Sequence, residues 1–311
     1  MSLAAFDDAP AAIIVTYEPD ESWAERLRAI MLVCPRCIVV DNSVTPGGRG
    51  YVRTTVSETK GAELIANPDN LGLGNALNQG CRRLHAAGHS WVITFDQDST
   101  PGPDFAGALL TAAARPGPKH PAVVGANWRD RGRPDHRSRH LQTKKPFGFS
   151  FRRLTADDDL TDVLCVITSG SLLSLKAWHD LGGFDETLFL DLVDTDFCLR
   201  ARRAGWTIAV AARAGLDHQR GAKRPVRFLG RTYYPSFMPP ARLHNLSRNR
   251  LRLFRRHSRR EPAWVAYELI FAGKLLADIL FLEDNKRAKL CACIRGTWQG
   301  LVKRDRPAGS P

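Results

Sequence analysis

Short runs of apolar and β-branched residues alternate along the first two hundred residues with stretches of helical periodicity. The runs predict strands at residues 11–16, 37–40, 63–66, 91–95, 163–167 and 207–210. The periodic stretches predict helices at residues 23–32, 75–87 and 194–204. Strands that alternate with helices predict an α/β fold, with a Rossmann-like, mostly parallel mixed sheet covered by helices on both faces.

Local signals refine this outline at two places. Asp194 begins the third predicted helix as a natural N-cap, and Gly205 follows that helix as its C-terminal stop. Residues 129–145 are basic, contain Gly and Pro, and have almost no apolar side chains. We therefore expect a flexible loop there, or a loop that contacts a substrate.

The last ninety residues differ from the rest in charge. Residues 219–311 hold 21 basic and 6 acidic side chains, whereas residues 1–218 hold 24 and 26. This division predicts a catalytic domain at residues 1–219 and a basic, mostly helical extension at residues 220–311. The extension favours an anionic partner such as a membrane surface, a nucleic acid or a polyanionic substrate, and its helices could also support an oligomer. A solvated basic surface is the simpler alternative.

Residues 263–282 form an apolar stretch that contains Glu268, Lys274 and Asp278. These charges make a membrane-spanning helix unfavourable. At helical spacing they fall within about 120° of one another, and the rest of the circumference is apolar. Such a helix either packs on the protein or lies in a membrane surface, and the basic run at residues 248–260 favours the surface.

The N-terminus and the cysteines indicate the compartment. Residues 1–10 are polar and acidic without an apolar stretch, so no secretion signal is predicted. Seven cysteines without a tight framework favour reduced thiols in the cytoplasm. Cys34 and Cys37 have metal-like spacing, but no second Cys or His pair lies near them, which favours a structural role.

Two aspartates, Asp96 and Asp98, stand one residue apart directly after the predicted strand 91–95. The carboxyl ends of strands form the ligand-binding edge of an open α/β sheet. Two carboxylates there suit a hard cation, Mg²⁺ or Mn²⁺, that also holds a diphosphate, although Asp also closes strands simply as a turn former. Asp98 is the expected direct ligand, Asp96 lies near the ligand's sugar, and His218 could add an imidazole.

Other motifs are weaker or excluded. Several carboxylates gather before the helix at 194–204; N-terminal dipole complementarity explains some of them, and one could act as a general base. The segment Asn70–Gly74 resembles a dinucleotide fingerprint, but Leu77 occupies the place of its third glycine. No nucleic-acid-binding motif accompanies the basic extension.

Taken in order, these residues resemble the family 2 glycosyltransferases of the GT-A fold, most closely their bacterial rhamnosyltransferase branch. The resemblance rests on Thr16-Tyr17, Asp41, Asn70 with Gly72 and Asn78, Phe95-Asp96-Gln97-Asp98, Ser169-Gly170-Ser171, Gly182-Gly183-Phe184-Asp185-Glu186, Val193-Asp194, His218 and Arg248-Asn249. The family commonly has Glu-Asp where this chain has Val193-Asp194, a change that the rhamnosyltransferase branch tolerates. The Gln-x-x-Arg-Trp motif of processive synthases is absent.

The resemblance implies an inverting, metal-dependent sugar transfer from a nucleoside diphosphate sugar to a hydroxyl of a glycan or lipid-linked acceptor, in cell-surface polysaccharide synthesis. It implies Asp194 as the catalytic base and a metal site at Asp96, Asp98 and His218. The donor-binding residues would be Thr16, Tyr17, Asp41, Asn70, Gly72, Asp96 and Gly170. The residues expected at the acceptor are Asp191, Arg248 and Asn249.

The branch favours dTDP-L-rhamnose as the donor. UDP-galactofuranose and a UDP-hexose are the alternatives within the same fold. A metal-dependent nucleotidyltransferase would share the metal and the nucleotide but would not need Asp194. The expected location is the cytoplasm, with peripheral attachment to the inner face of the membrane as a further expectation.

Overall fold

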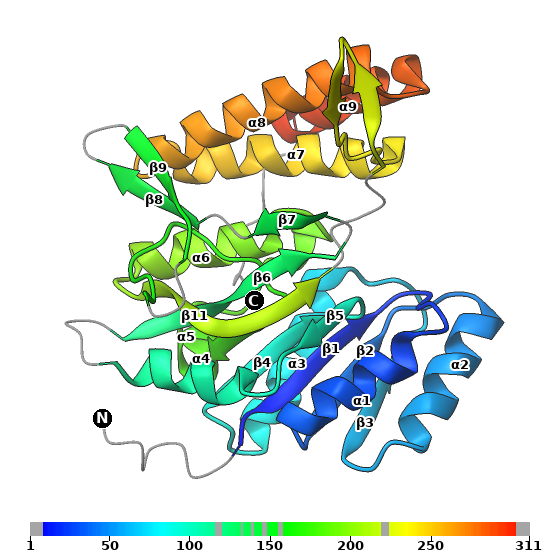
Figure 1. Ribbon diagram of the computed structural model, residues 1–311, viewed down its shortest axis with the longest axis vertical. Helices are drawn as coiled ribbons and strands as arrows, with labels where there is room; N and C mark the ends of the chain where they lie inside the picture. Colours follow the sequence, from blue (N-terminus) through cyan, green and yellow to red (C-terminus); the bar gives the residue numbers. More distant parts are fainter. Residues whose placement is uncertain are drawn as a thin grey trace. The chain divides into compact units, whose positions relative to one another are not determined.

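Figure 1 shows the computed structural model, which describes residues 9–115, 120–131, 133–137, 140–144, 148–154, 158–218 and 224–302. The chain forms two compact units. The first comprises Met1–Gln142, Phe151–Phe189 and Val193–Gln219. The second comprises Arg220–Pro311 together with two stretches from earlier in the chain, Thr143–Ser150 and Leu190–Leu192.

A nine-stranded mixed sheet forms the centre of the first unit, in the order β3-β2-β1-β4-β10-β6-β11-β5, with β7 paired to β6. The strands are β1 (Ala11–Thr16), β2 (Cys37–Asp41), β3 (Ala62–Ala66), β4 (Trp91–Asp96), β5 (Ser99–Pro101), β6 (Pro121–Asp130), β7 (Arg133–Arg137), β10 (Ser171–Ser174) and β11 (Thr207–His218). Strands β1 to β4 pair in parallel, and β10 runs antiparallel to β4 and β6. The predicted fold class is confirmed.

Helices cover both faces of this sheet because successive residues of a strand point to opposite sides. Ile14 faces a core cluster that contains side chains of α1 (Trp23–Val33), α2 (Pro46–Ser57) and α4 (Phe105–Ala114). Its neighbour Ile13 packs on the other face against α3 (Leu73–Ala86), where Gly80 leaves room for it. A Cβ at position 80 would lie 2.7 Å from the Ile13 side chain.

The sheet curls back on itself. Strand β4 ends at Asp96 and β5 begins at Ser99, although β10, β6 and β11 lie between them in the strand order. Only Gln97 and Asp98 separate β4 from β5, and β5 pairs with β11. The end of β11 must therefore lie next to the end of β4. In the β5–β11 register His218 is therefore the partner of Ser99.

Three local predictions are wrong: the strand at residues 163–167, the loop at residues 129–145 and the N-cap role of Asp194. Residues 163–167, all of them described, form no strand; Val163 N–H donates a single bond to Ile208 and Leu164 N–H one to Leu141. Val163, Leu164 and Val166 are buried without ladder pairing, and the strand lies later, at β10.

The segment 129–145 is not a loop in its described part. Strand β6 continues to Asp130, β7 pairs with it, and β8 (His140–Lys144) pairs with β9 (Gly148–Arg152). Polar and charged side chains do not prevent pairing at the edge of a sheet, because one side of the strand faces water. Residues 132, 138–139 and 145 of this segment lie outside the described residues.

The helix predicted at 194–204 is α6 (Val193–Arg203), preceded by α5 (Leu175–Asp180) and the 3₁₀ helix η2 (Glu186–Leu188). It begins one residue earlier than predicted, so Asp194 lies in its first turn and is not its N-cap. Gly205 ends it as predicted, with a φ of 93°, and Trp206 N–H donates back to Ala201.

Three helices and a hairpin form most of the second unit: α7 (Pro240–His257), α8 (Pro262–Phe281), α9 (Lys286–Val302), β12 (Val226–Phe228) and β13 (Arg231–Tyr233). Helices α7 and α9 approach closely because Gly296 and Gly300 face the α7 backbone. A Cβ at Gly296 would lie 2.1 Å from the His244 carbonyl oxygen. Within the described residues, no helix is long and apolar enough to cross a membrane.

Cys34 and Cys37 are free thiols buried in the core of the first unit. Desolvation raises the pKa of Cys34 to about 12 and that of Cys37 well above its usual value. Both side chains are therefore neutral and act as small apolar groups, in agreement with the structural role predicted for them.

Asn78 fastens α3 to the segment that leads into η2, and it gives a first prediction. Its side-chain oxygen accepts from Trp178 Nε1 (2.9 Å) and Phe184 N (2.8 Å), and its Nδ2 donates to the Phe184 carbonyl (2.9 Å). Because these groups are buried, Asn78→Ala should lower the free energy of unfolding by about 3 kcal/mol, measured by urea denaturation. The control is Asn75→Ala, which removes an exposed bond to Glu186 and a partly buried bond from Gln79 and should cost only about 1 kcal/mol. Equal losses would contradict this account.

Candidate active site

The curl of the sheet brings three side chains together. Asp96 ends β4, Asp98 lies in the turn to β5, and His218 ends β11. One ligand atom of each lies within 4.8 Å of the others, and this is the one such cluster among the described residues. Two carboxylates and an imidazole are a ligand set that Mg²⁺ and especially Mn²⁺ accept.

The environment of the Asp98 carboxylate fits a bound cation. Its Oδ1 is buried and accepts no hydrogen bond from the described residues, although it lies only 3.0 Å from His218 Nδ1. A buried carboxylate oxygen without a partner is unfavourable. A divalent cation held by Asp98, Asp96 and His218 would satisfy it.

Two serines support this cluster from behind. Ser99 Oγ lies 3.0 Å from His218 Nδ1 and 2.5 Å from Ser169 Oγ. Ser169 Oγ also accepts from the Asp96 backbone N–H at 3.1 Å. Both serines are fully buried, so they fix the imidazole and the end of β4 in one arrangement.

Gln97, between the two aspartates, is held on three sides. Its side-chain amide accepts from Tyr17 N (2.7 Å) and donates to Tyr17 O (3.1 Å). The backbone carbonyl of Gln97 accepts from Arg26 Nε at 2.7 Å, and Arg26 also forms an ion pair with Asp20. Tyr17 is 47% exposed, and its backbone is held next to the Asp96–Asp98 turn by these bonds to Gln97.

Asp41 forms a second polar centre, at the end of β2. Its Oδ1 accepts from Thr16 Oγ1 (2.8 Å), Ser43 Oγ (2.7 Å) and Ser43 N (3.1 Å). Ser43 Oγ accepts in turn from Glu18 N–H. The carboxylate of Glu18 accepts three bonds from Val44 and Thr45, and the bond from the Thr45 hydroxyl is the main cause that lowers its pKa. These bonds tie the loop after β1 to the loop after β2.

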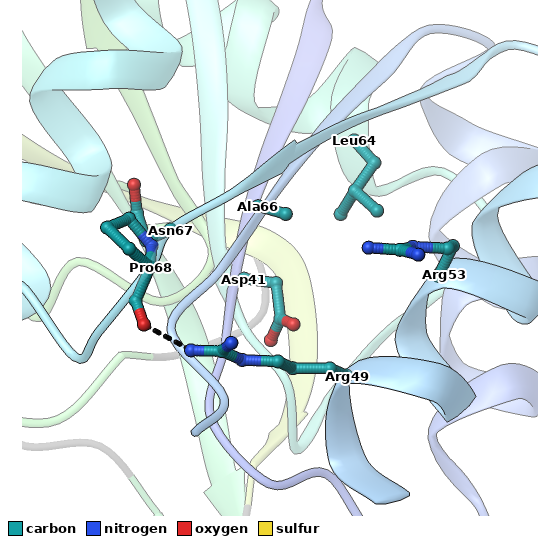
Figure 2. A pocket seen from close by; sticks show the side chains of 7 residues that line it. All are labelled: Asp41, Arg49, Arg53, Leu64, Ala66, Asn67 and Pro68. Carbon is teal, nitrogen blue, oxygen red and sulfur yellow. Dashed lines mark hydrogen bonds between the residues drawn. The ribbon is translucent and has the colours of Figure 1, made fainter. Parts of the chain in front are cut away.

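A cavity of about 240 Å³ opens beside Asp41 (Figure 2). Leu64 and Ala66 of β3 form its apolar wall, and Arg49 and Arg53 of α2 face it from the other side. Arg49 donates to the Ser43 and Pro68 carbonyls and so joins the loops after β2 and β3. The cavity has an apolar wall, a carboxylate and cations, which suits a heterocyclic base.

Asn70 and Gly72 shape the loop between β3 and α3. Asn70 Oδ1 accepts from Gly72 N at 3.0 Å. Gly72 has a φ of 84°, and a Cβ there would lie 2.5 Å from the Phe189 carbonyl oxygen, so glycine is required. Asn42 Nδ2 donates to the Gly72 carbonyl, which connects this loop to the end of β2.

Asp194 is half-buried in the first turn of α6, and its Oδ1 accepts from Thr195 N–H at 2.7 Å. It lines a small cavity of about 20 Å³ with Thr94, Thr168 and Ser171. Gly170 is buried nearby with a φ of 71°, and its N–H donates to the Thr94 carbonyl. Gly170 therefore fixes the backbone between β4 and β10.

The three residues predicted at the acceptor belong to the second unit. Asp191 accepts from Arg242 at 2.9 Å, and its carbonyl accepts from Asn249 Nδ2 at 2.9 Å. Arg248 Nε donates to Asn249 Oδ1 at 3.1 Å. Asp191, Arg248 and Asn249 thus form one polar group on α7 and the segment 190–192.

Comparison with known proteins decides the family. The model of the glycosyl transferase family 2 domain matches residues 13–181, more than half of the chain. The chain belongs to glycosyl transferase family 2. It is therefore an enzyme that transfers sugars, and the resemblance drawn from its motifs is confirmed.

Curated relatives of this glycosyltransferase include two rhamnosyltransferases. The dTDP-rhamnosyl transferase RfbF of Shigella flexneri is 27% identical over 216 residues, which cover 68% of this chain and 69% of RfbF. An N-acetylglucosaminyl-diphospho-decaprenol L-rhamnosyltransferase of Mycobacterium tuberculosis is 25% identical over 238 residues, 68% of this chain and 76% of that protein.

Solved structures agree on the GT-A fold. Residues 1–349 of S. aureus TarS superpose with a TM-score of 0.56 at 13% identity, covering 95% of this chain and 81% of that one. GalNAc-T7, crystallised with UDP, GalNAc and Mn²⁺, superposes with a TM-score of 0.55 at 11% identity over 77% of this chain. The chain spans about half of GalNAc-T7, 47% of its length.

Several supporting residues escaped the sequence analysis. Gln97 stands between the two aspartates, and its position alone could have drawn attention to it. Arg26, Asn42 and Ser99 gave no signal, since their partners lie between 6 and 119 positions away in the chain. Ser169 was part of a family motif, but no role was predicted for it.

The metal cluster yields a prediction for binding. Asp98→Asn removes the charge of the oxygen that has no hydrogen-bond partner, and we expect it to weaken Mn²⁺ binding about tenfold or more in the presence of dTDP. Electron paramagnetic resonance of free Mn²⁺ measures this affinity directly. Asp104→Asn, an exposed aspartate without a side-chain cap bond, should leave it unchanged. An unaltered affinity in Asp98→Asn would remove this residue from the site.

Proposed function

We propose that this glycosyltransferase moves L-rhamnose from dTDP-L-rhamnose to a hydroxyl of a glycan or lipid-linked acceptor, with inversion at the anomeric carbon, and that it serves cell-surface polysaccharide synthesis. The carrying observation is the cluster of Asp96, Asp98 and His218 at the carboxyl end of β4. The rhamnose donor is supported by the names of two relatives that each match about two thirds of this chain.

In this proposal Asp96, Asp98 and His218 hold Mg²⁺ or Mn²⁺. The cation, when bound, supplies Lewis-acid stabilisation of charge on the donor's diphosphate. Asp98 would provide the buried oxygen that accepts no hydrogen bond, and the buried serines behind His218 hold the imidazole in place. The leaving diphosphate needs no proton, so no second acidic carboxyl is required.

The donor's nucleoside would lie along the ends of β1, β2 and β4. Thr16 orients the Asp41 carboxylate, and Tyr17 is an exposed residue whose backbone binds Gln97. The cavity next to Asp41 would receive the base. Asn70 and Gly72 shape the adjoining loop, Gly170 fixes the backbone between β4 and β10, and Asp96 would address the ribose or sugar.

Asp194 would act as the general base. Asp194 is half-buried, and its Oδ1 accepts from Thr195 N–H. Asp194 would take the proton of the acceptor hydroxyl as that oxygen bonds to the anomeric carbon and the bond to the diphosphate breaks. Asp191, Arg248 and Asn249 would contact the acceptor. We place this reaction in the cytoplasm, at the inner face of the membrane when the acceptor is lipid-linked.

Substitution of the base tests the proposal. Base catalysis typically contributes about 10²–10⁴-fold, so Asp194→Asn should lose transfer activity by that factor. Calorimetry should find dTDP binding unchanged, because Asp194 does not hold the nucleotide. Asp180→Asn, an exposed carboxylate paired with Lys176, is the control and should retain activity. Full transfer activity in Asp194→Asn would reject Asp194 as the base.

A comparison of hydrolysis rates among candidate donors tests the identity of the donor. Purified protein with Mn²⁺ should hydrolyse dTDP-L-rhamnose slowly in the absence of acceptor, and faster than UDP-galactofuranose or UDP-glucose. Release of dTDP is followed by coupled phosphate detection. A preference for a UDP sugar would replace the rhamnose donor but keep the glycosyltransferase. Release of pyrophosphate from a nucleoside triphosphate would instead indicate a nucleotidyltransferase.

A further inference from the structure

Helix α8 turns its two acidic residues inward and many of its apolar side chains outward. Glu268 and Asp278 are buried, at 5% and 7% exposure, and Glu268 pairs with Arg250 of α7 at 3.0 Å. Burial raises the pKa of the Glu268 carboxyl, which reflects the cost of removing it from water. Meanwhile Ile270 and Phe281 are 63% and 62% exposed. A helix that faces water normally has the opposite arrangement.

The exposed side of α8 is a continuous apolar stripe. We call it the outer face of α8; it consists of Leu269, Ile270, Gly273, Leu276, Ala277, Leu280 and Phe281. At 100° per residue these positions span about 140° of the circumference. None of these seven residues is charged. Lys274 lies at one margin of the stripe and pairs with the buried Asp278. Since the stripe runs over 13 of the 20 residues of α8, from Leu269 to Phe281, it is about 20 Å long.

The β12–β13 hairpin extends the stripe at its C-terminal end. Phe228 packs on Phe281 with ring centroids 6.3 Å apart. Beyond it, Leu229 at the hairpin tip is 84% exposed, between Arg227 and Arg231. An apolar tip flanked by two cations therefore adjoins the outer face of α8.

Further cations lie where the chain leaves α8. Lys286 and Arg287 open α9 five and six positions after Phe281, and both are exposed. In the part of the chain that the structure describes, Arg227, Arg231, Lys286 and Arg287 form no ion pair. The exposed acid beside them, Asp284, is already paired with Arg224 at 3.0 Å. Helix α9 itself has no acidic residue.

We propose that the outer face of α8, with the hairpin tip, docks on the surface of an anionic phospholipid bilayer. The stripe would enter the boundary between head groups and acyl chains, and the cations at its end would contact lipid phosphates. A second copy of this chain is a poorer occupant, because two such faces would bring their cations together with no acidic partner. This docking surface goes beyond the sugar-transfer chemistry and does not depend on the donor.

Vesicle co-sedimentation of the full chain tests the proposal. The protein should bind phosphatidylglycerol-containing vesicles more tightly than pure phosphatidylcholine vesicles, and added salt should weaken binding. The double variant Ile270→Glu, Leu280→Glu should lose binding at least about tenfold, since it places two charges on the stripe. Lys286→Gln and Arg287→Gln should each weaken binding to anionic vesicles about fivefold.

Matched controls separate the surface from general effects. Leu32→Glu changes an 86% exposed leucine of α1 in the first unit, and Arg28→Gln changes an exposed cation of the same helix; both should bind vesicles as the unaltered protein does. Circular dichroism melting establishes that each variant is folded. Hydrolysis of dTDP-L-rhamnose in solution should persist in all of them. Its absence in the unaltered protein would count against the proposed function and leave the docking surface standing.

Three results would overturn the docking surface. The first is no salt-sensitive binding to anionic vesicles. The second is binding that the Ile270→Glu, Leu280→Glu variant retains in full. The third comes from analytical ultracentrifugation without lipid: a dimer that this variant converts to a monomer would assign the face to a second copy of the chain.

Discussion

The pairing of β5 with β11 is the interaction on which the candidate site depends. It closes the curled sheet upon the end of β4, and it sets Ser99 opposite His218. Without this pairing His218 would be an isolated histidine 120 residues after Asp98. With it, the imidazole lies 3.0 Å from the Asp98 carboxylate. The metal-like cluster is thus a product of strand register, since a register shift of one residue would turn His218 to the other face of the sheet.

The rest of the site is held by buried polar bonds between loops. Thr16, Asp41 and Ser43 join the ends of β1 and β2, while Ser99 and Ser169 join β5 to the approach of β10. Buried polar groups are costly unless all are satisfied, so these networks admit one arrangement of the loops. Such preorganisation matters for sugar transfer, because donors and acceptors must be placed before charge develops. The Asp98 oxygen that accepts no hydrogen bond is the exception, and it lies where a cation would.

The second unit uses its charge differently. Two of its acidic residues form buried ion pairs, Arg250–Glu268 and Lys289–Glu283, whose side chains are at most 10% exposed. Arg231, Lys286 and Arg287 are exposed cations at the C-terminal end of the apolar side chains that face outward from α8. Burying acids and exposing leucines is unfavourable for a helix surrounded by water. A surface that docks on a bilayer would suit an enzyme whose acceptor is carried on a membrane lipid.

The sequence by itself determined the α/β class, the strands β1 to β4 and the family, because these follow from local periodicity and from motifs that keep their order along the chain. It also placed Asp96 and Asp98 at a strand end. It was wrong about residues 163–167 and 129–145, where apolar content and strand pairing do not coincide. Only the tertiary structure decided that His218 reaches Asp98, that Gln97 is bound to Tyr17, and that α8 shows its apolar side to solvent. The reason is that these outcomes depend on hydrogen bonds and burial between segments far apart in the chain, which local propensity does not encode.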